Sequence, residues 1–178
     1  MVKNKTYRLV LSALFIAVGI YLPFLTGQIP EIGGKLLPMH IPVLLCGFVC
    51  GSEFGLIAGF ITPILRSLLF SMPPMYPGAI SMAFELATYG AVAGLLFTLF
   101  KCKKSAVLPS LLISMVSGRM VWGIVRYIMT FAGGAQFSMS LFLAGAIFDA
   151  VPGIILQLIL VPMLILILQP IIMKADRR

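Results

Sequence analysis

Six ionisable side chains lie inside strongly apolar stretches of the sequence: His40, Arg66, Glu85, Arg119, Arg126 and Asp149. Ionisable groups in such stretches normally pair with one another or line a substrate path, because lipid does not hydrate them. Arginine holds a carboxylate or phosphate through two parallel hydrogen bonds, and carboxylates accept from hydroxyl or amino groups. These residues are therefore the first candidates for a polar binding site.

The spacing of these residues places several of them on shared helix faces. Arg119 and Arg126 are seven residues apart, which is two helical turns, so they project from nearly the same face. Glu85 and Tyr89 are four residues apart and belong to one polar stripe. Trp122 lies between the two arginines, where it could stack on a planar ligand or simply fill the bundle.

The same charges could instead form a buried network without a ligand. Pairs such as Glu85 with Arg119, and Asp149 with Arg126, would then hold helices in register. As a group, however, three arginines face two carboxylates, which leaves about one positive charge uncompensated, with His40 in addition. If the three arginines and the two carboxylates are all ionised, an anionic or zwitterionic small molecule would neutralise the remaining positive charge.

Metal binding and catalysis are not favoured by the sequence. Cys46 and Cys50 are four residues apart with His40 nearby, but these three without a CxxC pattern are a weak signal for a metal. An intramembrane enzyme usually carries a cluster such as HExxH, which is missing here, and no P-loop motif could bind ATP. We therefore expect no metal, no other cofactor and no catalytic residue.

The composition requires lipid as the solvent for most of the chain. Of the 178 residues, 61% are hydrophobic and only 10% are charged, with a mean hydropathy of +1.12. So few charges cannot cover the surface of a soluble domain, and so much apolar surface is incompatible with disorder. The three cysteines lie in or beside apolar runs and are odd in number, which excludes a disulfide scaffold.

The positions of the basic residues explain most of the net charge of +8. Nine of the 13 Lys and Arg residues fall in three short clusters beside apolar segments, within 3–8, 101–104 and 174–178. Basic clusters of this kind mark the cytoplasmic loops and ends of membrane proteins. We therefore expect both termini in the cytoplasm and no nucleic-acid partner.

The apolar runs predict an all-α integral membrane protein with six transmembrane helices in one bundle. The spans are expected at about 7–25, 37–51, 54–71, 77–100, 107–131 and 140–172, in a single domain over 1–178. The second span would rise only about 22 Å, short of a bilayer core of roughly 30 Å, so it must be packed in protein or line a cavity. Counted from the outer ends of the spans, all six ionisable residues lie in the outer half or near the midplane, which predicts one polar cavity open to the outside.

Two local motifs accompany this layout. Ala13 and Ala17 form an AxxxA pattern on the first helix, and the stretch 37–45 reads LPMHIPVLL and continues through Gly47 and Gly51. With the chain length, helix count, topology and outward-facing pocket, these motifs resemble the S components of energy-coupling factor (ECF) transporters over essentially the whole chain. Small residues one turn apart are also common in ordinary helix packing, so the motifs are not specific alone.

The resemblance implies a substrate-binding subunit of an importer in the bacterial plasma membrane that does no chemistry itself. It would capture a vitamin or related micronutrient from outside, and one membrane coupling subunit with two ATPases would drive its release inside. Ala13 and Ala17 would contact the coupling subunit. The expected substrate site comprises His40, Arg66, Glu85, Tyr89, Arg119, Trp122, Arg126 and Asp149.

A stand-alone ion-coupled transporter is the alternative function. Such a protein would need ionisable groups through both halves of the membrane and, typically, inverted internal repeats, and the sequence shows neither. The arginine excess points to an acidic or zwitterionic substrate such as pantothenate, nicotinate, a pyridoxine-type vitamer or a nucleobase-like precursor, without selecting one.

Overall fold

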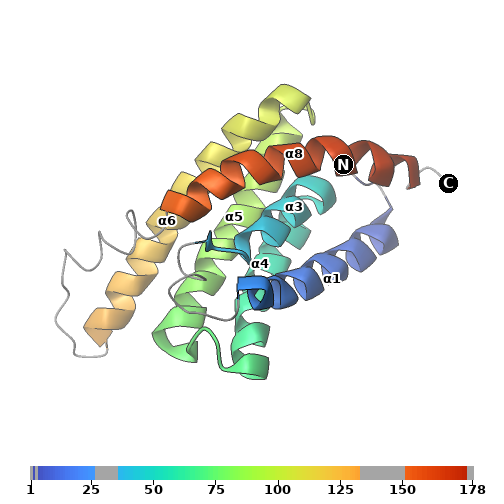
Figure 1. Ribbon diagram of the computed structural model, residues 1–178. Coiled ribbons are helices and arrows are strands. Elements are labelled where there is room, and N and C mark those ends of the chain that lie inside the picture. The colour runs from blue at the N-terminus through green and yellow to red at the C-terminus, as the bar shows by residue number, and fades with distance from the viewer. Residues whose placement is uncertain (1, 3, 27–35, 133–150, 176–178) are drawn as a thin grey trace.

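Helices make up most of the computed structural model, which describes residues 2, 4–26, 36–132 and 151–175 (Figure 1). The helices are α1 (Lys5–Tyr21), α3 (His40–Cys50), α4 (Ser52–Phe70), α5 (Ile80–Leu99), α6 (Val107–Ala132) and α8 (Val151–Ala175). Short helical turns adjoin them at Leu22–Thr26, Met75–Ala79 and Lys104–Ala106. Within these ranges there is no strand, and the predicted all-α fold is confirmed.

Five helical segments in the described ranges are long and apolar enough to cross a membrane: Lys5–Leu25, Ser52–Phe70, Met75–Leu99, Lys104–Ala132 and Val151–Ile172. Four of the predicted spans agree with the first four of these to within a few residues. The predicted span 37–51 is α3, an apolar helix of 11 residues that is shorter than the others. The span 140–172 overlaps α8, and its first part lies outside the described residues. Six membrane crossings therefore stay a prediction.

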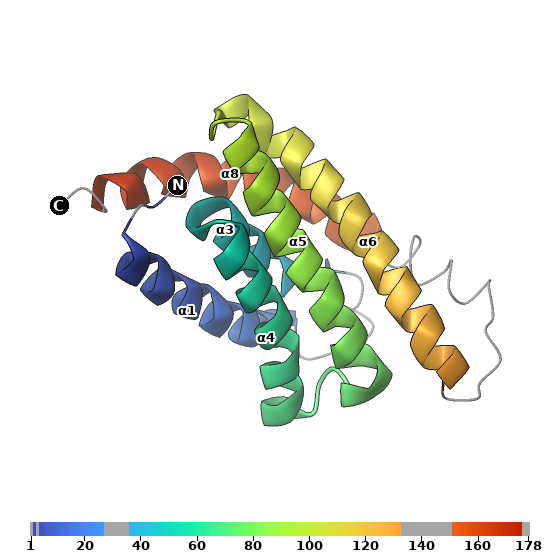
Figure 2. The same cartoon turned by 180° about the vertical axis from the view of Figure 1, so that it is seen from behind.

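The short helix α3 is enclosed by the rest of the bundle. All of its residues are buried, and α1, α4, α5 and α8 pack around it (Figures 1 and 2). It ends at Gly51, whose φ of 99° is readily adopted only by a residue without a side chain. Packing on all sides agrees with the expectation that a helix too short to span the bilayer must be covered by protein.

Glycines bring the backbones of α4 and α5 into direct contact. A side chain on Gly90 would overlap the backbone of Gly55, and a side chain on Gly59 would overlap the backbone of Leu86. Contacts between 55 and 90 and between 59 and 86 also show that the two helices are antiparallel. This close approach fixes the rotation of α5, whose residues Glu85 and Tyr89 are both buried.

Both termini lie toward the same end of the bundle (Figures 1 and 2). The backbone N–H of Val2 donates to the carbonyl of Val49, and Arg8 donates to the carbonyl of Cys50, so the N-terminal segment contacts the last turn of α3. Ile172 of α8 belongs to the same buried apolar cluster as Val2. That both termini lie on one side of the membrane stays a prediction. The cytoplasmic assignment of that side still rests on the basic clusters.

Candidate functional site

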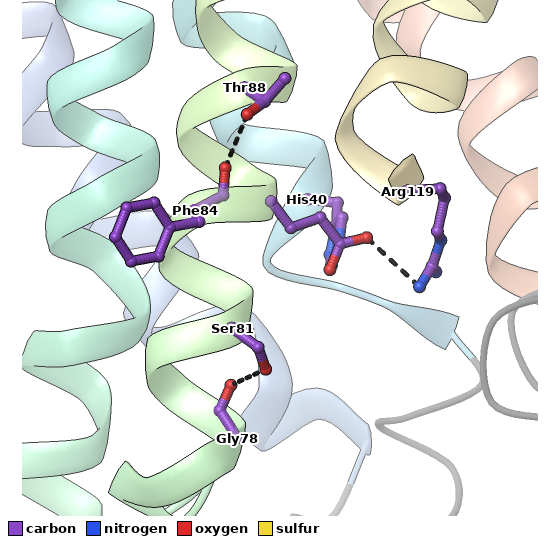
Figure 3. Close-up of polar contacts among 7 residues, drawn as sticks. His40, Gly78, Ser81, Phe84, Thr88 and Arg119 are labelled. Atoms are coloured by element: carbon purple, nitrogen blue, oxygen red, sulfur yellow. Dashed lines mark hydrogen bonds and ion pairs between the residues drawn. The ribbon is translucent and has the colours of Figure 1, made fainter. Parts of the chain in front are cut away.

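A buried carboxylate, that of Glu85 on α5, joins three helices. Its Oε1 lies 3.2 Å from Nη1 of Arg119 on α6 and 3.5 Å from Nε2 of His40, the first residue of α3. Figure 3 shows His40 and Arg119 on separate helices, with a dashed line that marks the ion pair of Arg119. His40 stands at the opposite end of α3 from the turn that contacts the N-terminal segment. The contact therefore lies in the half of the bundle away from the termini.

Tyr89, one turn after Glu85, completes the group. Its ring centroid lies 5.2 Å from that of His40 in an edge-on arrangement, and its side chain is fully buried. The hydroxyl lies in the electrostatic field of both Glu85 and Arg119. We call His40, Glu85, Tyr89 and Arg119 the Glu85 cluster. The polar stripe predicted along this helix thus faces the interior of the bundle.

Gly118 sets the distance between α5 and α6 at this cluster. The ring of Tyr89 occupies the space in which a side chain on residue 118 would begin, and the backbone oxygen of Glu85 would lie 3.1 Å from its Cβ. Because Gly118 directly precedes Arg119, the same close contact places the guanidinium within reach of Glu85. Any larger residue here would separate the two helices or displace Tyr89.

Several polar atoms of the Glu85 cluster are buried without a hydrogen-bond partner. Within the described residues these atoms are Nδ1 and Nε2 of His40, Oε1 of Glu85, Oη of Tyr89, and Nε and Nη2 of Arg119, although Oε1 of Glu85 is ion-paired with Nη1 of Arg119. Leaving a buried donor or acceptor unpaired costs about 1–3 kcal/mol, and the great majority of buried polar groups are paired. Such a concentration of unpaired atoms at one place is therefore a candidate site for a polar ligand.

Trp122 and Arg126 extend this group along α6. The guanidinium carbon of Arg119 lies 5.7 Å from the centroid of the Trp122 ring, and that of Arg126 lies 5.9 Å from it. Both distances are within the range of cation–π attraction. The three residues predicted from their spacing thus form a continuous row, and no carboxylate within the described residues is ion-paired with Arg126.

Arg66 lies apart from the Glu85 cluster. Its guanidinium donates to the carbonyl of Ile20 on α1 and lies over the rings of Phe24 and Phe70, at 5.2 Å and 5.8 Å from their centroids. These contacts hold the end of α1 against the end of α4. Of the predicted site residues, Asp149 lies outside the described residues.

Replacing Arg66 by methionine should lower the free energy of unfolding by about 1–3 kcal/mol, because the buried Ile20 carbonyl would lose its donor. Arg126→Met is the matched control, since it removes only a ring contact worth about 0.5–1 kcal/mol. Thermal unfolding of the purified proteins in detergent measures the difference. Equal losses in the two variants would contradict a structural role for Arg66.

Two further buried polar side chains were not singled out from the sequence. Gln157 of α8 and Ser110 of α6 are fully buried, and their side-chain polar atoms have no hydrogen-bond partner in the part of the chain that the structure describes. The burial of Gln157 could have been predicted from the sequence, because it is an amide within an otherwise apolar run and polar residues of membrane helices mostly face the interior of the bundle. Ser110 offers no such signal, since serine is common in membrane helices as a small packing residue.

The model of the family "ECF transporter, substrate-specific component" matches residues 7–165. The chain belongs to this family. The resemblance inferred from the sequence is thereby confirmed, and the matched range includes the whole Glu85 cluster together with Ala13 and Ala17. Comparisons with curated proteins and with solved structures find no match.

Membership has direct consequences for the chain. An ECF substrate-specific component is a transporter subunit that takes a small-molecule substrate and works with an energy-coupling module. Together with the five apolar helices of spanning length in the described ranges, this identifies a multi-pass membrane protein. The Glu85 cluster is then a candidate for contact with the transported molecule.

In this ECF component, α1 presents one face to the bundle and leaves the other exposed. Leu11 and Phe15 are buried on the side that packs against α3 and α4. Ala13 and Ala17 lie on the exposed side, beside Leu14, whose exposed fraction is 56%. The two alanines are thus available to a partner in the membrane and are not used in packing the bundle.

Proposed function

We propose that this chain captures a vitamin or related micronutrient from outside a bacterial plasma membrane, for ATP-driven import. The observation that carries the proposal is the set of buried, unpaired polar atoms in the Glu85 cluster, in the half of the bundle away from the termini. With the termini in the cytoplasm, as the basic clusters predict, that half faces outside. The chain itself catalyses no reaction in this role.

Energy for release comes from a separate module of one membrane coupling subunit and two ATPases. Ala13 and Ala17 support this part of the proposal, because both are exposed on one face of α1. Small residues one turn apart allow a second helix to pack closely against the backbone. The coupling subunit is therefore proposed to bind this face of α1.

Ala13→Trp should abolish uptake while leaving ligand binding by the isolated protein unchanged. The indole would hold the coupling subunit away from α1, whereas the Glu85 cluster on the other helices stays intact. The measurements are uptake of the molecule that native mass spectrometry finds on the purified protein, and co-purification of the coupling subunit.

Ile113→Trp on α6 is the matched control for this experiment. Ile113 is also exposed to the surroundings of the bundle, at 46%, but lies far from the AxxxA face in sequence and on another helix. Cells that carry the Ile113→Trp variant are expected to take up the substrate normally. Normal uptake by Ala13→Trp would show that the interface is wrong, and uptake in cells without any coupling module would favour the stand-alone transporter.

A further inference from the structure

We propose that the substrate carries a singly charged carboxylate, and that this carboxylate binds the free edge of Arg119. This substrate class rests on the proposed function, in which the Glu85 cluster contacts the transported molecule. The remaining part of the substrate is expected to carry a group that both donates and accepts hydrogen bonds, such as a hydroxyl.

The guanidinium of Arg119 is only partly used within the protein. Nη1 forms the ion pair with Glu85, whereas Nε and Nη2 are buried and have no hydrogen-bond partner among the described residues. The N–H bonds of Nε and Nη2 point in parallel from one edge of the planar group, at a spacing that matches the two oxygens of a carboxylate. The unpaired atoms of Arg119 thus form one complete bidentate donor.

The local charges favour a single negative charge on the ligand. Arg119 and Glu85 cancel as an ion pair, and Arg126 adds one positive charge across the Trp122 ring without an ion-paired carboxylate in the described part of the chain. A carboxylate completes this balance. A dianionic phosphate would place an excess negative charge beside the buried Glu85, where charge is poorly solvated.

A neutral amide is also a poor match for this edge of Arg119. It offers a single acceptor oxygen, and its NH₂ group would face a second N–H donor. One donor of the guanidinium would then stay unpaired in the bundle. The site therefore discriminates a carboxylic acid from its amide by the number of acceptors that the ligand presents.

The other unpaired atoms of the Glu85 cluster indicate which polar groups the ligand carries besides its carboxylate. The Tyr89 hydroxyl can both donate and accept hydrogen bonds, and the two ring nitrogens of His40 lie beside it without a hydrogen-bond partner in the described part of the chain. A hydroxyl or a ring nitrogen on the ligand satisfies them, whereas a purely hydrocarbon group leaves them unpaired. We therefore place the substrate among small monocarboxylic acids with at least one further polar group.

Acetate, acetamide and inorganic phosphate are suitable probes for this proposal. The purified full chain is freed of co-purified ligand by extensive exchange in detergent, and its thermal unfolding is followed at constant ionic strength with each probe. Acetate should raise the midpoint of unfolding, and acetamide and phosphate should raise it less or not at all. An equal effect of acetamide, a larger effect of phosphate, or no effect of acetate overturns the proposal.

Two matched variants assign the acetate effect to the edge of Arg119. Arg119→Lys keeps the positive charge beside Glu85 but lacks the paired donors, so acetate affinity should fall by about tenfold or more. Arg8→Lys, at the end of the bundle away from the Glu85 cluster, keeps its charge and is expected to bind acetate within about threefold of the parent protein, because its contacts are with the Cys50 carbonyl and the Phe54 ring. Undiminished acetate binding by Arg119→Lys overturns the assignment, as does an equal loss in both variants.

The acetate test of the substrate class and the uptake test of the proposed function can fail independently of each other. If acetate does not bind but Ala13→Trp still abolishes uptake, the substrate class is wrong and the function stands. If acetate binds as expected but uptake needs no coupling module, the function is wrong and the carboxylate site stands.

Discussion

Glu85→Ala should lower the free energy of unfolding by about 3–5 kcal/mol, because removal of one partner from a buried ion pair leaves the other charge uncompensated. Glu85 is 1% exposed, so water cannot readily replace its carboxylate at the Arg119 guanidinium. His40 would lose the same neighbour. The variant should therefore purify poorly and unfold at a lower temperature or denaturant concentration in detergent.

Glu53→Ala is the matched control for this change. Glu53 is an exposed glutamate in the first turn of α4, where a negative charge contributes only about 0.3–1 kcal/mol through the helix dipole. Glu85→Gln keeps the shape but removes the charge, and its stability should fall between the two alanine variants. If Glu85→Ala were as stable as Glu53→Ala, the ion pair with Arg119 would not be holding the bundle together.

A double variant separates the structural part of the ion pair from its role in binding. Replacing both Glu85 and Arg119 by leucine should recover much of the lost stability, because apolar residues of similar size remove both buried charges at once. The same protein should not bind acetate, since the paired donors of Arg119 are gone. Recovered stability together with acetate binding would show that another group holds the anion.

Gly118→Ala should separate α5 from α6 and disrupt the site from a distance. The new methyl group would overlap the ring of Tyr89, and overpacking of this kind costs about 1–3 kcal/mol. Because residue 118 precedes Arg119, relief of the clash moves the guanidinium away from Glu85. Both the free energy of unfolding and the affinity for acetate are therefore expected to fall.

Gly78→Ala tests whether loss of any glycine has this effect. A methyl group at residue 78 would meet Pro73 and Pro74 at 3.5 Å and 3.7 Å, which is ordinary van der Waals contact, so little change is expected. A second variant tests the cause: Tyr89→Leu should reduce the damage done by Gly118→Ala, so that the two changes together cost less than their sum. Additive losses would show that the Tyr89 contact is not the reason.

The candidate site shows where prediction from sequence ends. Arg66, Arg119 and Arg126 are all arginines in apolar segments, and their depth alone gave no basis for separating them. The structure places Arg66 on the Ile20 carbonyl and between two phenylalanines, whereas Arg119 contacts Glu85. The difference lies in which neighbouring helix each side chain faces. That depends on rotation and crossing of helices, which residue spacing within one helix does not encode.

The sequence left two interpretations of the buried charges open, an internal ion-pair network and a ligand-binding site. In the structure, the two interpretations apply to different atoms of the same residues. Glu85 and Arg119 do pair within the protein, as the buried network predicts, through Nη1. The other guanidinium nitrogens nevertheless remain unpaired, as a binding site requires. Residue types and net charge could not reveal this, because hydrogen-bond satisfaction is a property of single atoms in a fixed geometry.

Hydropathy and breaks by Gly and Pro act locally, so they were enough to predict lipid as the solvent of the chain, its helical class and the approximate positions of most helices. Residue spacing also placed Glu85 and Tyr89 on one helix face. What the residue pattern could not show is that Gly118 brings Arg119 to Glu85 and that Arg66 instead contacts the Ile20 carbonyl. These features depend on close contacts between residues distant in sequence, where the absence of a single methyl group sets the distance between two helices.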